Sequence, residues 1–162
     1  MNHPIVCGLY SIKDKYFQDF QNPYWMDNKN ERRPYYYLLE DRDGILWVIP
    51  ISSQVDNYRR KIEREERKRG RGNCIYYHIG ALASGERVFL IGDMFPIHES
   101  YIKAPFTIGE KHYIIRNKKL NSAVRSKAMR YLKLIEGGVM KSRNDIMGIK
   151  KILLMREKRP ES

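Results

Sequence analysis

Two runs of β-forming residues flank Asp43 and Gly44, and this pattern constrains the fold more than any other feature of the 162-residue chain. The first run covers Tyr35 to Glu40 and the second covers Ile45 to Ile51. Two such runs on either side of an Asp-Gly dipeptide are the strongest short-range signal for a β-hairpin. The sequence therefore predicts an antiparallel sheet that contains this hairpin.

Other segments extend the predicted sheet and surround it with helices. Strands are expected at 8–10, 73–78, 88–92 and 94–97, and a short β-like segment at 112–116. Apolar residues recur every three or four positions at 13–20 and 146–155, which predicts two helices. A third helix is expected to begin at Asn121, its N-cap, and to end at Gly137-Gly138. Residues 59–71 form a charge block with almost no apolar face, which predicts a solvated helix or loop.

Length and composition fit a single domain over residues 1–162. No repeat or long linker divides the chain. The longest apolar runs are too short to cross a bilayer, and the first residues lack the charged start and apolar core of a secretory signal. With only Cys7 and Cys74, a disulfide framework is not expected, so a reducing cytoplasm fits best.

The charge of the chain favours a polyanionic partner. Lys and Arg number 31 against 19 Asp and Glu, a net charge of +12. Solubility needs only about 2 to 8 charges in a small domain, and nucleic acid is the commonest cytoplasmic polyanion. Between Lys111 and Ile135 the sequence has no Asp or Glu but eight Lys or Arg residues. A basic amphipathic helix there could also lie on anionic lipid, but it lacks Trp and Phe for insertion, so RNA is the favoured partner.

Chemistry that needs a bound metal or nucleotide finds little support in the sequence. Cys74 and His78 form a C-x3-H pair with no second pair nearby, whereas structural zinc needs four ligands. The acidic residues are too scattered to suggest a magnesium cage, and no Walker or G-x-G-x-x-G pattern is present. The sequence therefore predicts no metal site and no cofactor.

The remaining groups are those that a metal-free ribonuclease uses. Such an enzyme needs a proton acceptor for the ribose 2′-OH, a donor for the departing 5′-oxygen, and fixed cations around the phosphorus. The candidates are Tyr16, Tyr35, Ser52, Ser53 and His78. Taken one at a time, each of these residues is better explained by a structural role. Tyr35 would pack in a strand, Ser52 and Ser53 would form the turn after the hairpin, and His78 would end a strand. Spacing alone does not identify a catalytic site.

Several short motifs together resemble one known family. They are SIKDKY at 11–16, RPY at 33–35, VIPISS at 48–53, the segment from Cys74 to His78, MFPI at 94–97 and the basic helix before Gly138. In this order they resemble the endoribonuclease toxins of bacterial type III toxin-antitoxin systems, the ToxN/AbiQ family. The resemblance covers about Gly8 to Gly138, and residues 139–162 extend beyond it.

Membership would imply an α+β fold with a strongly twisted antiparallel sheet, partly barrel-like, and helices around it. It would also imply metal-independent RNA cleavage through a 2′,3′-cyclic phosphate. The inhibitor would be a small repeated pseudoknot RNA antitoxin, held in a closed assembly with several toxin copies. Phage defence is the role that goes with this system.

The resemblance also assigns residues. The Thr-Ser pair of the family falls on Ser52 and Ser53, with Ser53 the more distinctive hydroxyl, and the helix tyrosine and hairpin position fall on Tyr16 and Tyr35. Where the family often has a lysine, this chain has Val55, so another cation must face the phosphate. The candidate RNA-binding residues are Arg33, Arg59, Arg60, Lys61, Arg64, Lys118, Lys119, Arg125 and Arg130.

Two other functions stay open at this stage. A non-catalytic RNA-binding module would use the same basic surface without cutting RNA. A DNA-contacting protein of a mobile element is less favoured because the sequence shows no recognition-helix motif.

Overall fold

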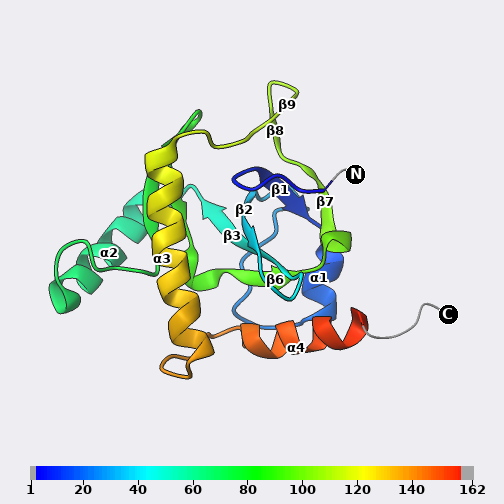
Figure 1. Ribbon diagram of the computed structural model, residues 1–162. Helices are drawn as coiled ribbons and strands as arrows, with labels where there is room; N and C mark the ends of the chain where they lie inside the picture. The colour runs from blue at the N-terminus through cyan, green and yellow to red at the C-terminus, as the bar shows by residue number, and fades with distance from the viewer. Residues whose placement is uncertain (1–2, 158–162) are drawn as a thin grey trace.

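The computed structural model describes residues 3–157 and has an antiparallel sheet at its centre with helices around it (Figure 1). The main sheet contains β1 (Leu9–Ile12), β2 (Tyr35–Glu40), β3 (Leu46–Ser52), β4 (His78–Leu82), β5 (Gly85–Phe89), β6 (Phe95–Ile97) and β7 (Ile102–Pro105). A separate two-stranded finger is formed by β8 (Thr107–Ile108) and β9 (Lys111–His112). The helices are α1 (Asp14–Asp19), α2 (Val55–Arg69), α3 (Lys118–Glu136) and α4 (Ile146–Glu157), with short 3-10 turns η1 (Ile91–Asp93) and η2 (Glu99–Tyr101). The predicted α+β class is confirmed.

Strand β3 is the centre of the sheet. The strand order is β4-β5-β3-β2-β1-β7, and β6 also pairs with β3. One end of β3 pairs with β5 through Ile51 and Ser52, while its other end pairs with β6 through 46–48. Because β4 and β7 are at opposite ends of this order, the sheet is open and does not close into a barrel.

The predicted hairpin is present, and its turn is tightly bonded. Strands β2 and β3 pair from Tyr35–Pro50 to Glu40–Leu46. Gly44 has φ +80°, a conformation that glycine adopts without strain, and its N–H donates to the carbonyl of Asp41 at 3.0 Å. The Asp41 carboxylate accepts hydrogen bonds from the backbone of Asp43 and Ile45. Local sequence is therefore sufficient to form this hairpin.

Two predicted boundaries were wrong. The strand expected at 73–78 begins only at His78, because Cys74 and Ile75 are buried without joining the strand ladder. Helix α3 is capped by Asn117, whose side chain accepts the N–H of Leu120 at 3.1 Å. Asn121 lies one turn inside the helix, where its amide is bonded to other parts of the chain. Strands β7 at 102–105 and β8 at 107–108 were not predicted, and the β-like segment expected at 112–116 contributes only His112 to β9. The other differences are shifts of element ends, including β5 at 85–89 in place of 88–92.

The charge block forms a helix that begins earlier than the block itself. Helix α2 starts at Val55 and ends before Gly70, and Tyr58 is its buried residue. Most of its charged side chains are exposed, as the lack of an apolar face predicts.

The two faces of the sheet carry different helices. His78, Phe89 and Ile51 are register partners across β4, β5 and β3, so their side chains lie on one face. Helix α3 covers this face: a Cβ on Gly80, two residues after His78, would lie 2.5 Å from the Leu120 side chain. Ile79, Val88 and Ser52 are the neighbouring set of partners and point to the opposite face. Helix α2 packs on this face through Tyr58, and α1 packs on it through Phe17, which stacks on Tyr35.

Helix α4 belongs to the same packed body as the sheet. Ile146, Ile149 and Leu153 are buried in the main core, and α4 runs along β6 (Figure 1). Lys150 forms ion pairs of 2.9 and 3.0 Å with Asp41 and Asp43 in the hairpin turn. Of the extension 139–162, residues 158–162 lie outside the described part of the chain.

None of the helices within residues 3–157 has the length and apolar character needed to cross a membrane.

Candidate functional site

The two serines at the end of β3 have different environments. Ser52 is 3% exposed, and its hydroxyl oxygen accepts the N–H of Gln54 at 3.2 Å. Ser53 is exposed between β3 and α2, and its carbonyl accepts the N–H of Val55 at 2.9 Å. The backbone on both sides of Ser53 is therefore fixed, while its side chain faces the surface. Ser52 is held in the turn, and Ser53 is the hydroxyl that a ligand can reach.

Arg33 is a buried cation attached to the same strand end. It is 4% exposed; its Nε donates to the carbonyl of Asp27 at 2.7 Å, and its Nη1 donates to the carbonyl of Ile51 at 2.8 Å. Within residues 3–157 no carboxylate lies within 4.0 Å of its guanidinium nitrogens. Removing a charge from water without an acidic partner is unfavourable unless another anion is bound. Arg33 is therefore suited to a phosphate beside Ser52 and Ser53.

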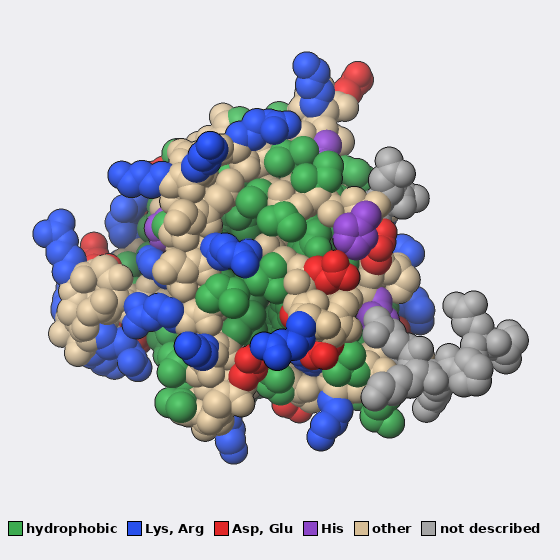
Figure 2. Space-filling view, viewed as in Figure 1, with side chains coloured by type: hydrophobic (Ala, Val, Ile, Leu, Met, Phe, Trp, Pro, Cys, Tyr) green, Lys and Arg blue, Asp and Glu red, His purple; other side chains and the backbone are tan. Residues whose placement is uncertain are grey.

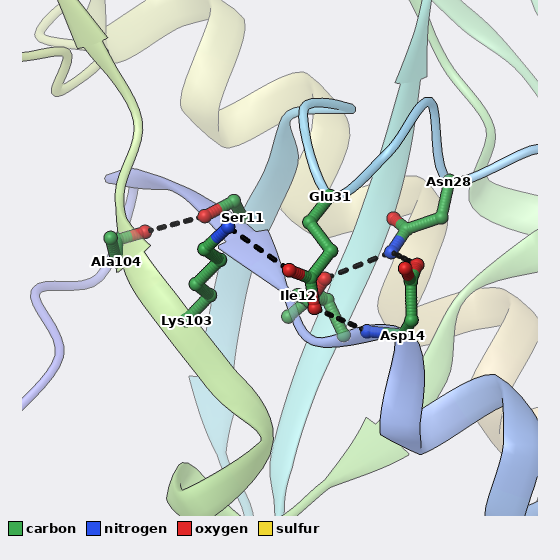
Figure 3. Close-up of polar contacts among 7 residues, drawn as sticks. All are labelled: Ser11, Ile12, Asp14, Asn28, Glu31, Lys103 and Ala104. Atoms are coloured by element: carbon green, nitrogen blue, oxygen red, sulfur yellow. Dashed lines mark hydrogen bonds and ion pairs between the residues drawn. The ribbon is translucent and has the colours of Figure 1, made fainter.

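A buried asparagine organises the loop that leads to Arg33. Asn28 is 8% exposed and donates to the carbonyl of Ile12 and to the Asp14 carboxylate, both at 2.9 Å (Figure 3). The side-chain amide oxygen of Asn28, Oδ1, accepts a hydrogen bond from the hydroxyl of Tyr35 at 2.8 Å. Asn28 thus ties the loop to β1, to the start of α1 and to β2.

The loop after Asn28 has a strained backbone that a carboxylate holds in place. Lys29, Asn30 and Glu31 have φ values of 52°, 56° and 63°, in the left-handed region that non-glycine residues rarely adopt. The Glu31 carboxylate accepts the backbone N–H of Asp14 at 2.7 Å and pairs with Lys103 at 3.0 Å (Figure 3). These contacts fix the path of the chain into Arg33.

The two candidate tyrosines lie in the core. Tyr16 is fully buried, donates to the carbonyl of Pro96 at 2.9 Å and stacks on Phe95. Tyr35 is 1% exposed and bonds to Asn28. Burial raises the pKa of both phenols, so both stay protonated at neutral pH. In this structure they support the walls of the site and do not face a ligand.

His78 is on the other face of the sheet from Ser52, with β5 between them. Its Nδ1 lies 3.0 Å from the Nζ of Lys127 on α3. Burial, followed by the nearby Lys127 charge, lowers the pKa of His78 to about 4, and burial also lowers the pKa of Lys127. A neutral imidazole that accepts a hydrogen bond from the ammonium fits both shifts. The predicted catalytic residues are thus not brought together as one cluster.

His78 makes stability depend on pH in a defined window. Its pKa is about 4 in the fold against an ordinary value of 6.5, so the unfolded chain binds more protons between these values. The contribution of His78 to stability is therefore fully present above its unfolded-state pKa of 6.5, and it is lost as the pH falls toward its folded-state pKa of about 4. After allowance for partial exposure we expect a loss of about 1 to 2 kcal/mol, which His78→Gln removes.

Urea unfolding of both proteins at about pH 7 and about pH 4.5 measures this effect. His3→Gln is the matched control, because the side chain of His3 is 61% exposed. An equal pH response in the parent protein and His78→Gln would contradict the assignment.

The candidate RNA-binding cations are divided between three places. Arg33 is buried at the end of β3. On α2, Arg59 pairs with Glu86 at 3.3 Å and Lys61 lies 4.8 Å from the centre of the Tyr58 ring, while Arg60 and Arg64 are exposed. On α3, Lys118, Lys119, Arg125 and Arg130 are all exposed. Figure 2 shows Lys and Arg side chains along α3 and around α2.

A groove runs between α3, the hairpin turn and α4. Its volume is about 970 Å³. Arg125, Arg130 and Lys133 line it from α3, and Trp47 and Met129 are among its apolar residues. Figure 2 shows hydrophobic side chains exposed beside the cations of α3. Acidic residues of the hairpin turn and Glu136 also line it, so the groove combines both charges with an apolar floor.

Sequence reasoning missed several residues of these sites. Asn28 lies between the helical spacing at 13–20 and the strand that starts at Tyr35, and no local pattern distinguishes it. Lys127 lies in the segment from Lys111 to Ile135 that has no Asp or Glu, but its pairing with His78 depends on how α3 packs on β4. Asp93 and Asn144, both buried, also have no signal in the sequence.

The comparisons with known proteins concern the fold. No protein-family model and no curated protein matches the chain. The solved structure of AbiQ, a lactococcal anti-phage endoribonuclease belonging to the type III toxin-antitoxin system, has a TM-score of 0.59 and 11% identity, covering 80% of this chain and 82% of that chain. A protein of a bacterial antiviral system regulated by a processed non-coding RNA has a TM-score of 0.51 and 12% identity, covering 83% of this chain and 89% of that chain. The resemblance found in the sequence is thus confirmed at the level of the fold.

Proposed function

We propose that this protein is a metal-independent endoribonuclease toxin of a type III toxin-antitoxin system, inhibited by a small pseudoknot RNA. The observation that carries the proposal is the buried, carboxylate-free Arg33 beside the Ser52-Ser53 strand end. The fold shared with an anti-phage endoribonuclease supports it, and so does the net charge of +12. Phage defence and a cytoplasmic location belong to the same proposal.

In the proposed reaction the ribose 2′-OH attacks the adjacent phosphorus. A bond forms between the 2′-oxygen and phosphorus, the bond from phosphorus to the 5′-oxygen breaks, and a 2′,3′-cyclic phosphate remains. The 2′-OH loses a proton and the departing 5′-oxygen gains one. The Arg33 guanidinium balances the charge that develops on the phosphate oxygens, and the Ser53 hydroxyl donates to one of them.

The proposal makes a direct prediction about the products. Pure protein should cut single-stranded RNA in EDTA and leave 2′,3′-cyclic phosphate ends, because the substrate supplies its own nucleophile. Replacing the 2′-OH at the cut site by hydrogen should stop cleavage and leave binding nearly unchanged. Cleavage that strictly requires added magnesium would contradict the mechanism, and binding without any new ends would favour a non-catalytic RNA-binding module.

The basic surface of α3 is the proposed docking site for RNA. Its exposed cations lie on the helix that covers the His78 face of the sheet, whereas Ser52 points to the other face. An RNA chain that contacts both must therefore cross an edge of the protein. Such a path fits a closed assembly in which one antitoxin RNA touches several toxin copies.

Salt dependence tests this docking surface. Changing an α3 cation that binds a phosphate to Ala should reduce the slope of log affinity against log salt by about 0.7 for single-stranded RNA and about 0.9 for a duplex. The variants are Lys118→Ala, Lys119→Ala, Arg125→Ala and Arg130→Ala, and Lys151→Ala on α4 is the control. Unchanged slopes across the set would move the docking site to α2.

A further inference from the structure

We infer that the hydroxyl of Tyr58 on α2 is the proton donor to the departing 5′-oxygen in RNA cleavage. The inference rests on the proposed function, because it assigns a role in that reaction. Tyr16 and Tyr35, the tyrosines expected from the sequence, both spend their hydroxyls on hydrogen bonds in the core. The hydroxyl of Tyr58 forms no hydrogen bond within residues 3–157, so it remains available to a ligand.

Tyr58 lies over the end of β3 that carries the two serines. Helix α2 begins two residues after Ser53, which places Tyr58 in its first turn. The ring of Tyr58 packs with Val88 on β5 and with Leu90 just after that strand. Val88 is the register partner of Ser52, so the ring lies on the Ser52 face of the sheet.

Charged groups of both signs act on the Tyr58 hydroxyl. Burial, followed by the negative charge of Asp93, raises the pKa of Tyr58, whereas the positive charges of Arg33 and Arg143 lower it. The hydroxyl is therefore near the cation that is proposed to bind the scissile phosphate, and near a second cation. Since the net shift is upward from 10.0, the phenol is protonated at neutral pH and has a proton to donate.

The ring is fixed, while its oxygen borders solvent. Tyr58 as a whole is 7% exposed. Its ring centre lies 5.0 Å from that of Tyr77 and 4.8 Å from the Nζ of Lys61. Within residues 3–157 the Tyr58 oxygen is not among the buried polar atoms that are both sealed from water and unpaired. An unpaired hydroxyl on a fixed ring can donate without first breaking another hydrogen bond.

The proposed step is the breaking of the bond between phosphorus and the 5′-oxygen. The electron pair of this bond goes to the 5′-oxygen, which takes the Tyr58 proton and leaves as an alcohol. The Arg33 and Arg143 cations stabilise the phenolate that remains. Water accepts the proton of the 2′-OH and returns one to Tyr58, so the enzyme ends unchanged. An alkoxide is a far stronger base than a phenolate, so the transfer is favourable even though the pKa of Tyr58 is raised.

The test uses two RNA substrates that differ at one atom of a mapped cut site, the 5′-oxygen or a sulfur in its place. A thiolate leaves without being protonated, because it is a much weaker base than an alkoxide. Tyr58→Phe should lower the single-turnover rate on the oxygen linkage by about 10²- to 10⁴-fold, the usual contribution of a positioned acid. The variant should cut the sulfur linkage at close to the parent rate.

RNA affinity and melting temperature should not change in Tyr58→Phe, because the lost hydroxyl has no partner and the ring keeps its packing. Tyr77→Phe is the matched control. Tyr77 packs against Tyr58, and its hydroxyl also forms no hydrogen bond within the described chain. Burial, followed by the Asp93 charge, raises the pKa of Tyr77 to about 12, and Arg33 is not among the groups that shift it. Tyr77→Phe should cut both linkages at the parent rate.

Three outcomes would overturn the inference alone. They are an equal loss on both linkages in Tyr58→Phe, a parent-like rate of this variant on the oxygen linkage, and an equally selective loss in Tyr77→Phe. Each of them leaves the proposed function standing, because the parent protein still cuts RNA. Failure of the parent to cut either substrate would instead overturn the proposed function together with the inference.

Discussion

Replacing Arg33 with Met is expected to lower the rate of RNA cleavage by about 10³-fold, because the methionine keeps the stem of the side chain and loses the fixed charge at the phosphate. Arg33→Lys keeps a charge but not the planar fork and should lose about 10²-fold. Single-turnover cleavage, RNA affinity and urea unfolding are measured for each variant. The carbonyls of Asp27 and Ile51 lose their donor, so we also expect destabilisation of about 1 to 3 kcal/mol.

Arg32→Met is the matched control for this experiment. Arg32 is the exposed neighbour of Arg33, so its loss removes the same charge from the chain without changing the buried site. Near-normal cleavage by a folded Arg33→Met protein would show that Arg33 serves only to hold the loop.

Ser53→Ala is the second variant with a large expected effect. Loss of one fixed donor to a developing charge typically lowers the rate by about 10² to 10³, or roughly 3 to 4 kcal/mol of transition-state stabilisation. Because Ser53 is exposed, its replacement should leave the melting temperature and the affinity for antitoxin RNA unchanged. Growth arrest in cells and RNA cleavage should both be lost.

Ser52→Ala separates the two hydroxyls. Its hydroxyl oxygen accepts the N–H of Gln54, so we expect a stability loss of about 1 kcal/mol and a smaller effect on the rate. The assignment to Ser53 fails if Ser53→Ala cuts RNA at the normal rate, or if Ser52→Ala alone abolishes cleavage.

The fold was predictable where local chemistry determines it. The Asp43-Gly44 turn between two β-rich runs forms the expected hairpin, and the apolar spacing from Val124 to Ile135 forms the buried side of α3. The boundary at 73–78 was wrong because burial of Cys74 and Ile75 gives the same apolar pattern as strand pairing. The cap of α3 was misplaced because Asn117 and Asn121 are equivalent candidates until the start of the helix is known.

The candidate site was only partly predictable, because it depends on register between distant strands. Ser53 and Arg33 were recognised as individual residues, but nothing local shows that the guanidinium bonds to the carbonyl of Ile51. The separation of His78 from Ser52 follows from the pairing of β4 with β5 and of β5 with β3. The approach of Tyr58 to Arg33 depends on how α2 packs on β5, which no local pattern shows.

The ion pairs of Lys150 with Asp41 and Asp43 give the chain an order of assembly during its synthesis. The hairpin leaves the ribosome long before α4, so its turn aspartates and the apolar surface that receives Ile146, Ile149 and Leu153 must wait for that helix. Until α4 is made, the nascent chain exposes this apolar surface, to which chaperones can bind. A chain that terminates before α4 would lack the ion pairs of Lys150 with the hairpin turn and would be more susceptible to proteolysis.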